Sequence, residues 1–341
     1  MTAPWVASAF AEPVRQWLLN RQEEVAQGQS GRAVGQSDID ALWAMSEAFT
    51  DADQRLGGGY ARDTLLQYVN QVVLPLLNGS YRDAIGRQLM AATARLCNLC
   101  GFMSYDSGHQ GLAQRYFIQA LRLAQAGGHR ELGACILGDM STQANRRGDA
   151  DQALELAIAG YRTALNCGSA LAAARCAAAQ GRAHASRGDQ RASGQACALA
   201  ERTLDRAVLT GERTWVKRYT PDHLLADRLY MARDLGRTGD VQQIAPAVLA
   251  SSAGKGRRRL LGTTALAASY LPARGNAHSD VDRACEVLGQ ALPSLGSLNS
   301  ALSLQRFNTV RRALAGHANR PSVQEFEDRF RTTVAAAGTR T

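Results

Sequence analysis

The stretch CGFMSYDSGHQGLAQRYFIQALRLAQAGG, residues 100–128, contains a pattern that returns further along the chain. Gly108 is followed by apolar or small residues spaced along one helix face, and the same arrangement follows Gly148 and Gly188, at intervals of 40 residues. Small residues also precede each glycine, which allows two antiparallel helices to approach closely, and the glycine permits a tight turn between them. The pattern therefore predicts an all-α protein built from antiparallel helix pairs.

Two later segments continue the pattern at a different spacing. Residues 229–250 contain a copy in which Gly239 is the expected turn, and residues 265–292 contain a copy with a longer turn. Stacked helix pairs with small facing residues are typical of the tetratricopeptide repeat, whose period is about 34 residues and whose first helix carries aromatic residues. This chain has a longer period and lacks those aromatic residues. We therefore expect a tetratricopeptide-like right-handed superhelix with longer helices.

The repeat offers a local explanation for the polar residues that surround the first turn glycine. Ser104, Tyr105, Asp106 and His109 are close in sequence, but catalytic partners normally meet through the fold. We interpret this segment as a turn between two helices.

Other short motifs also lack the residues that chemistry needs. The glycine run in LGGGYAR, residues 56–62, has no lysine for a phosphate loop and is better suited to end a helix. The charge run KGRRR, residues 255–259, could contact phosphates, but a charge run at the start of a helix is more often a solvated face, and we favour that interpretation. The chain contains no familiar catalytic or metal-binding motif, so we expect neither an enzyme nor a cofactor.

Four segments occur in the order typical of a known family. They are DQRLGGGYAR (53–62), YVNQVVLPLLNGSY (68–81), the block 101–128 and TWVKRY (214–219). Together they resemble the C-terminal tetratricopeptide-repeat-type domain of actinobacterial helix-turn-helix (XRE-type) transcriptional regulators, over residues 37–332. The resemblance implies that the repeats sense a ligand or partner, while a separate helix-turn-helix reads DNA.

The segment before the repeats departs from this family. Only 36 residues precede the first expected helix, and the helices of a DNA-reading domain do not fit there. We expect that this domain was lost, never existed or is supplied by a partner. The expected organisation is an N-terminal arm and linker (1–36), a helical N-terminal part of the solenoid (37–93), three repeats (94–209), an insertion (210–222), C-terminal repeats (223–332) and a tail (333–341).

The N-terminal arm carries an apolar set of residues: Trp5, Val6, Phe10, Trp17 and Leu18. The arm is too short to build its own core, so we expect it to dock on a neighbouring surface. Docking on a second copy would produce a homodimer, and docking on its own chain is the alternative.

The insertion carries Trp215 and Tyr219 just before a helix that Thr220 and Pro221 should start. A segment of this kind either covers the core between two repeats or acts as a ligand lid. We favour the cover.

Composition and charge limit the classes of function. No run of about 18 uncharged apolar residues occurs and the N-terminus is a poor signal peptide, so we expect a cytoplasmic protein with no membrane contact. The seven cysteines, an odd number, indicate free thiols in a reducing compartment. The net charge of +9 arises after residue 100. A basic C-terminal half permits nucleic acid as a partner, although charge alone does not favour it.

The groove of the expected superhelix is lined by the first helix of each pair. Asparagine pairs with backbone amides and guanidinium groups grip carboxylates, so the groove suits a peptide, an acidic small molecule or a partner protein. The alternative is that these arginines are merely solvated. The expected ligand-binding residues are Arg95, Asn98, Phe102, Tyr105 and Asp106 in the first pair, Thr142, Asn145 and Arg146 in the second, Arg175 and Arg182 in the third, and Arg233 and Arg237 in the fourth.

Three classes of function remain open from these features. The favoured class is a regulatory tetratricopeptide-repeat protein, similar to a transcriptional regulator, that binds a peptide, small effector or partner protein in its groove. The second is a DNA-binding regulator that acts through the basic C-terminal half. The third is a helical enzyme of unassigned reaction.

Overall fold

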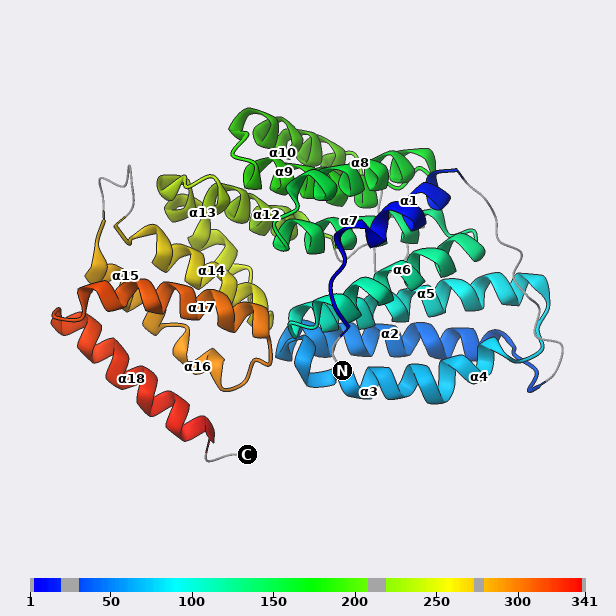
Figure 1. The fold of residues 1–341 in the computed structure, drawn as a ribbon, viewed down its shortest axis with the longest axis horizontal. Helices are drawn as coiled ribbons and strands as arrows, with labels where there is room; N and C mark the ends of the chain where they lie inside the picture. Colours follow the sequence, from blue (N-terminus) through cyan, green and yellow to red (C-terminus); the bar gives the residue numbers. More distant parts are fainter. Residues whose placement is uncertain (1–2, 20–30, 208–218, 273–278, 339–341) are drawn as a thin grey trace.

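A computed structural model describes residues 3–19, 31–207, 219–272 and 279–338, and these ranges form an all-α fold (Figure 1). Within them no strand occurs beyond an isolated bridge between Ala33 and Ser80, and no helix is both long and apolar enough to cross a bilayer. The helices are α1 (Ala11–Leu18), α2 (Gln36–Leu56), α3 (Gly58–Tyr68), α4 (Leu74–Leu77), α5 (Asp83–Asp106), α6 (Gln110–Ala126), α7 (Arg130–Arg146), α8 (Ala150–Asn166), α9 (Ala170–Ser186), α10 (Gln190–Asp205), α12 (Pro221–Asp234), α13 (Thr238–Ala250), α14 (Gly256–Ser269), α15 (Val281–Gly289), α16 (Leu292–Leu295), α17 (Ala301–Leu314) and α18 (Pro321–Gly338), with 3₁₀ turns at Ala7–Phe10 and Ala315–His317 and a π-helical turn at Val69–Val73.

Helices α5 to α10 form three sequential pairs, as the repeat predicts: α5 packs on α6, α7 on α8 and α9 on α10. Gly108, Gly148 and Gly188 make the turns within these pairs, with φ values of 86°, 86° and 76° that disfavour a side chain. Gly128 and Gly168 adopt the same conformation between the pairs. One helix and one turn therefore recur every 20 residues, which is half of the predicted period.

The fourth turn is not where the sequence pattern placed it. Gly236 has a φ of 68°, and its N–H donates to the carbonyl oxygen of Arg233 at the end of α12. Gly239 instead lies inside α13, so its assignment as the turn is wrong. A residue with a left-handed backbone conformation has to follow the last turn of the helix directly. Because α12 ends earlier than the pattern predicts, this residue is Gly236, three positions before Gly239.

Four expected segment boundaries fall inside helices; those at 36/37 and 222/223 lie within the first two residues of α2 and α12, and the other two lie deeper. The boundary between residues 93 and 94 lies within α5, a continuous helix that packs on α2 and α3 as well as on α6. The expected tail from residue 333 begins within α18, which continues to Gly338.

The first helices of the pairs form an inner layer that closes on itself. Along this layer α5 packs on α7, α7 on α9, α9 on α12 and α12 on α14. Helix α14 then returns to α2, which packs on α5 (Figure 1). We call these six helices, α2, α5, α7, α9, α12 and α14, the inner ring. It brings the C-terminal helices against the start of the repeats.

The glycine run at the start of α3 allows this closure. Gly57 ends α2 with a φ of 84°, as predicted for the run. The N–H of Gly59 donates to the carbonyl oxygen of Asn299 (2.9 Å), and the N–H of Asn299 donates to the carbonyl oxygen of Leu56 (2.7 Å). A Cβ on Gly57 would lie 2.5 Å from the carbonyl oxygen of Asn299, so only glycine permits this approach of the two backbones. We call this contact between residues 56–59 and 299–300 the seam.

The N-terminal arm docks on its own chain, against α6, α7 and α8 (Figure 1). Phe10 and Trp17 are buried, whereas Val6 and Leu18 are exposed. The indole N–H of Trp17 donates to Oγ1 of Thr163 (3.1 Å). The arm is therefore part of the repeat core.

Candidate functional site

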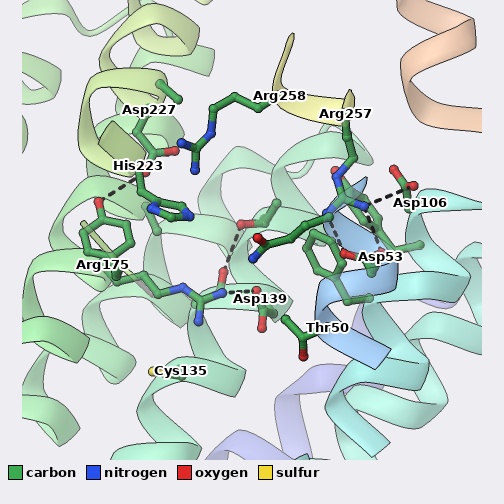
Figure 2. Close-up of a pocket in the computed structure, with 18 of the residues that line it drawn as sticks. Thr50, Asp53, Asp106, Cys135, Asp139, Arg175, His223, Asp227, Arg257 and Arg258 are labelled. Atoms are coloured by element: carbon green, nitrogen blue, oxygen red, sulfur yellow. Dashed lines mark hydrogen bonds and ion pairs between the residues drawn. The ribbon is translucent and has the colours of Figure 1, made fainter. Parts of the chain in front are cut away.

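A cavity of about 330 Å³ lies inside the inner ring, and all six ring helices contribute to its wall (Figure 2). Helices α5, α7 and α9 supply one side, with residues such as Asn98, Asp139 and Arg175. The opposite side comes from α12 and α14, with Asp227 and Arg258. Residues that are far apart in the sequence therefore meet in one site.

The first polar cluster of the wall is centred on Asp139 of α7. The guanidinium of Arg175 on α9 forms a salt bridge with this carboxylate (2.5 Å), and the amide of Asn98 on α5 donates to it (2.9 Å). Burial lowers the pKa of Arg175, but the Asp139 carboxylate, acting together with the Cys135 and Cys176 thiols, holds this pKa above its usual value. The cluster ties three consecutive inner helices together.

The second cluster is centred on Asp227 of α12. Arg182 approaches this carboxylate at 3.5 Å, and the hydroxyl of Tyr219 donates to it at 3.2 Å. Burial raises the pKa of Asp227 above its usual value, although Arg182 and the Tyr219 hydrogen bond act in the opposite direction. Burial therefore favours the protonated form of the Asp227 carboxyl.

The third cluster closes the ring. Arg257 on α14 donates both guanidinium nitrogens to the carboxylate of Asp53 on α2 (3.0 and 2.7 Å) and lies 3.2 Å from the carboxylate of Asp106 on α5. Asp106 also accepts from the N–H of Gly58 and the hydroxyl of Ser300 (both 2.8 Å). Figure 2 shows this cluster across the cavity from Asp227.

The cavity carries an excess of positive charge. Its described lining includes six basic side chains (Arg95, Arg175, Arg182, Lys255, Arg257 and Arg258) and four aspartates (Asp53, Asp106, Asp139 and Asp227), a difference of two charges with His223 neutral. Burial lowers the pKa of Arg258 and that of Lys255, because neither has a carboxylate close enough to offset the loss of water. An anion bound here would offset that cost.

Most of the predicted groove residues line this cavity, but four do not. Arg146 and Arg233 lie beyond its lining, at the C-terminal ends of α7 and α12, and Asn145 is half-buried beside Arg146. Arg237 forms an exposed ion pair with Asp240. The residues that do line the cavity are Arg95, Asn98, Phe102, Tyr105, Asp106, Thr142, Arg175 and Arg182.

The structure changes the role of one of these residues. Asp106 was expected to face a ligand, but it is fully buried and its carboxylate binds groups of the seam. Its contacts are therefore structural.

The repeat pattern missed the residues that ring closure adds. In the run KGRRR, expected to be a solvated face, Lys255, Arg257 and Arg258 line the cavity. Their inward orientation depends on the contact between α14 and α2, which no local pattern contains.

The end of the insertion also reaches the cavity. Tyr219 is buried in its wall, and Pro221 starts α12 as predicted, with the N–H of Thr220 donating to Nδ1 of His223 (3.3 Å). Trp215 lies outside the described residues.

Comparison with known families, characterised proteins and solved structures gave no match to this chain. Its own geometry must therefore carry any functional argument. In the part of the chain that the structure describes, no three His, Cys, Asp or Glu residues gather closely enough to hold a metal ion. The arrangement that remains is a cationic and partly aromatic cavity inside the inner ring.

Proposed function

We propose that this chain is a regulatory protein of the tetratricopeptide-like superhelical type, which binds a small acidic effector inside the inner ring. One observation carries the proposal, namely a cavity of about 330 Å³ whose described lining has two more positive than negative side chains. Cavities of roughly 300–1,000 Å³ are typical for small-molecule ligands.

Ring closure favours a small molecule over a peptide or a partner protein. An extended peptide needs a groove that is open along its length, and here the contact between α14 and α2 closes the inner layer. To admit a peptide, the protein would have to separate Arg257 from the buried carboxylates of Asp53 and Asp106. Removing one partner from a buried ion pair costs about 3–5 kcal/mol.

The same geometry suggests how binding would be transmitted. Arg258 belongs to α14, whereas Arg175 and Arg182 belong to α9, so an anion that contacts both sides would favour the closed ring. The outer helices pack directly on this ring, so a change in ring closure would shift their positions and change the surface that a partner binds. A role in transcriptional regulation follows from the family resemblance and is part of the proposal.

The structure gives less support to DNA binding by the C-terminal half. Arg257 and Arg258 point into the cavity, and Arg311 is held in a bidentate contact with Glu327 (2.8 and 2.7 Å). Arg257 and Arg258 are therefore directed away from a surface that a duplex could reach, and the charge of Arg311 is already paired. A steep loss of duplex affinity with added salt would instead favour this alternative, because phosphate contacts release counterions.

Filling the cavity tests the proposal. Gly138 lies on the cavity wall in α7, and a Cβ at this position would meet only the Cys176 sulfur, at an ordinary 3.7 Å. We expect Gly138→Phe to fold, and its affinity for the effector to fall at least about tenfold, because the introduced phenyl group occupies the ligand volume. Native mass spectrometry of protein purified gently from its host would measure the bound small molecule.

Gly194→Phe is the matched control, since Gly194 lies on α10 with no atom within 4 Å of a Cβ. This variant should retain the same adduct as the wild type. The proposal is contradicted if the wild type carries no small molecule, or if Gly138→Phe carries the wild-type amount.

A further inference from the structure

Four arginines gather at one end of the inner ring. Helices α5, α7, α9 and α12 are the first members of consecutive antiparallel pairs, so they run in the same direction and their C-terminal ends lie together. These ends supply Arg146, Arg182 and Arg233, and α17, which packs on α5, adds Arg306. We call Arg146, Arg182, Arg233 and Arg306 the arginine collar.

Two aromatic rings hold the collar at the mouth of the cavity. The guanidinium carbons of Arg182 and Arg233 lie 5.2 and 5.1 Å from the ring centroid of Tyr230, which lines the cavity. Tyr105, also in the cavity wall, lies within electrostatic range of Arg146, Arg182 and Arg306. The four positive charges therefore border the ligand space.

Among the residues that the structure describes, two of these four charges have a carboxylate partner. Arg233 pairs with Asp234 (2.7 Å) and Arg182 with Asp227 (3.5 Å). Within the described ranges, Arg146 makes a hydrogen bond to Oε1 of Gln305 (2.6 Å) and no ion pair, and Arg306 makes neither. The collar thus has two uncompensated positive charges.

The electrostatics of Arg306 show that this arrangement is unfavourable in the free protein. Burial, together with repulsion from Arg233 and Arg146, lowers the pKa of Arg306 to about 10, and Asp234 offsets only part of this effect. Favourable contact with helix dipoles explains arginines in a last helical turn, such as Arg146 and Arg233. It does not explain Arg306, which lies in the middle of α17.

We propose that the arginine collar binds a dianionic phosphoryl group, and that the rest of the same ligand extends past Tyr105 and Tyr230 into the cavity. A phosphate monoester carries a charge of about −1.5 to −2 at pH 7, which matches the two uncompensated positive charges. Guanidinium groups also bind phosphate oxygens through paired hydrogen bonds. This inference rests on the proposed function, because it names the chemical class of the effector.

Inorganic phosphate is the probe for the collar. At fixed ionic strength, phosphate should raise the melting temperature of the full-length protein, and sulfate should compete with it, whereas acetate and chloride should have no such effect. The variant Arg306→Met should melt at a higher temperature than the wild type without ligand, because it removes a half-buried charge that Arg146 and Arg233 repel. Its phosphate affinity should fall at least about tenfold.

Arg312→Met provides the matched control, since Arg312 lies exposed on the same helix. It should keep the wild-type phosphate affinity. Equal stabilisation by acetate and phosphate, or equal phosphate affinity in wild type and Arg306→Met, would overturn the collar.

The outcomes also separate this inference from the proposed function. Suppose that the co-purifying molecule lacks a dianionic group and binds Arg306→Met as tightly as the wild type. Phosphoryl binding by the collar would then be refuted, whereas effector binding in the cavity would be supported. Phosphate binding that depends on Arg306, in a protein that never carries an organic molecule, would support the collar and refute the effector.

Discussion

Replacing Trp17 with alanine is expected to lower the free energy of unfolding by about 3–5 kcal/mol, as for large aromatic residues in other cores. Trp17 is completely buried although it belongs to the short arm. Its ring fills the space beside Gly133, where a Cβ would lie only 2.0 Å from the indole, and the guanidinium of Arg130 lies over the ring, 4.2 Å from its centroid. Alanine would leave a cavity and an unpaired Thr163 hydroxyl. Urea unfolding would measure the loss.

Leu18→Ala is the control, because Leu18 is the next residue on the same helix and is 53% exposed. It should change stability by less than about 0.5 kcal/mol. A Trp17→Ala variant with wild-type stability would mean that the arm does not dock on its own chain. Sedimentation of the wild type would then test the homodimer alternative.

Replacing Arg257 with methionine is expected to cost about 3–5 kcal/mol, because it leaves two buried carboxylates without their cation. Asp106 is fully buried and Asp53 nearly so. The Asp53 and Asp106 carboxylates hold the pKa of Arg257 above its usual value although burial lowers it, which indicates that attraction exceeds desolvation. Urea unfolding measures the cost. Hydrogen exchange should also show faster exchange of amides in α2 and α14.

Two comparisons separate charge loss from loss of side-chain volume. Arg259→Met changes an exposed neighbour in α14 and should be close to neutral. The double variant Asp53→Asn/Arg257→Met should be more stable than the sum of the two single losses predicts, because the neutral amide no longer needs the cation. Additive losses would show that Arg257 and Asp53 do not interact.

The helical hairpins could be predicted from sequence because their signals are local. Turn glycines such as Gly108 and Gly148 are required by a left-handed backbone conformation, and small residues on the preceding helix are required by close packing. The 40-residue pattern includes only alternate turns, so it does not reveal the 20-residue unit. Gly128 and Gly168, at the turns between pairs, lie outside that pattern.

The cavity could be predicted only on the sides that the repeats build. Arg175 and Arg182 follow from helical spacing on α9, and they do line it. Arg257 and Arg258 were assigned to solvent because a charge run at a helix start usually is solvated. Their inward direction depends on a contact between residues about 200 positions apart, Arg257 with Asp53, which periodicity cannot reveal. The contact of Asp106 with Arg257 depends on the same closure.

Closure of the inner ring at the seam is the central claim, and a pair of cysteines tests it most directly. A Cβ on Gly59 would lie 2.6 Å from Cγ of Asn299, so the two Cβ atoms are at most about 4.1 Å apart, given a C–C bond of about 1.5 Å. That separation fits a disulfide, for which about 3.5–4.5 Å is usual. The variant Gly59→Cys/Asn299→Cys is compared with each single variant and with Gly194→Cys/Asn299→Cys, whose first cysteine lies on the outer helix α10.

The measurement is peptide mass spectrometry under mild oxidation, after free thiols have been blocked. If the ring is closed, residues 59 and 299 form an intramolecular disulfide in nearly all molecules, and the control pair does not. Free thiols at both positions under the same conditions would contradict the closed ring and, with it, the effector cavity.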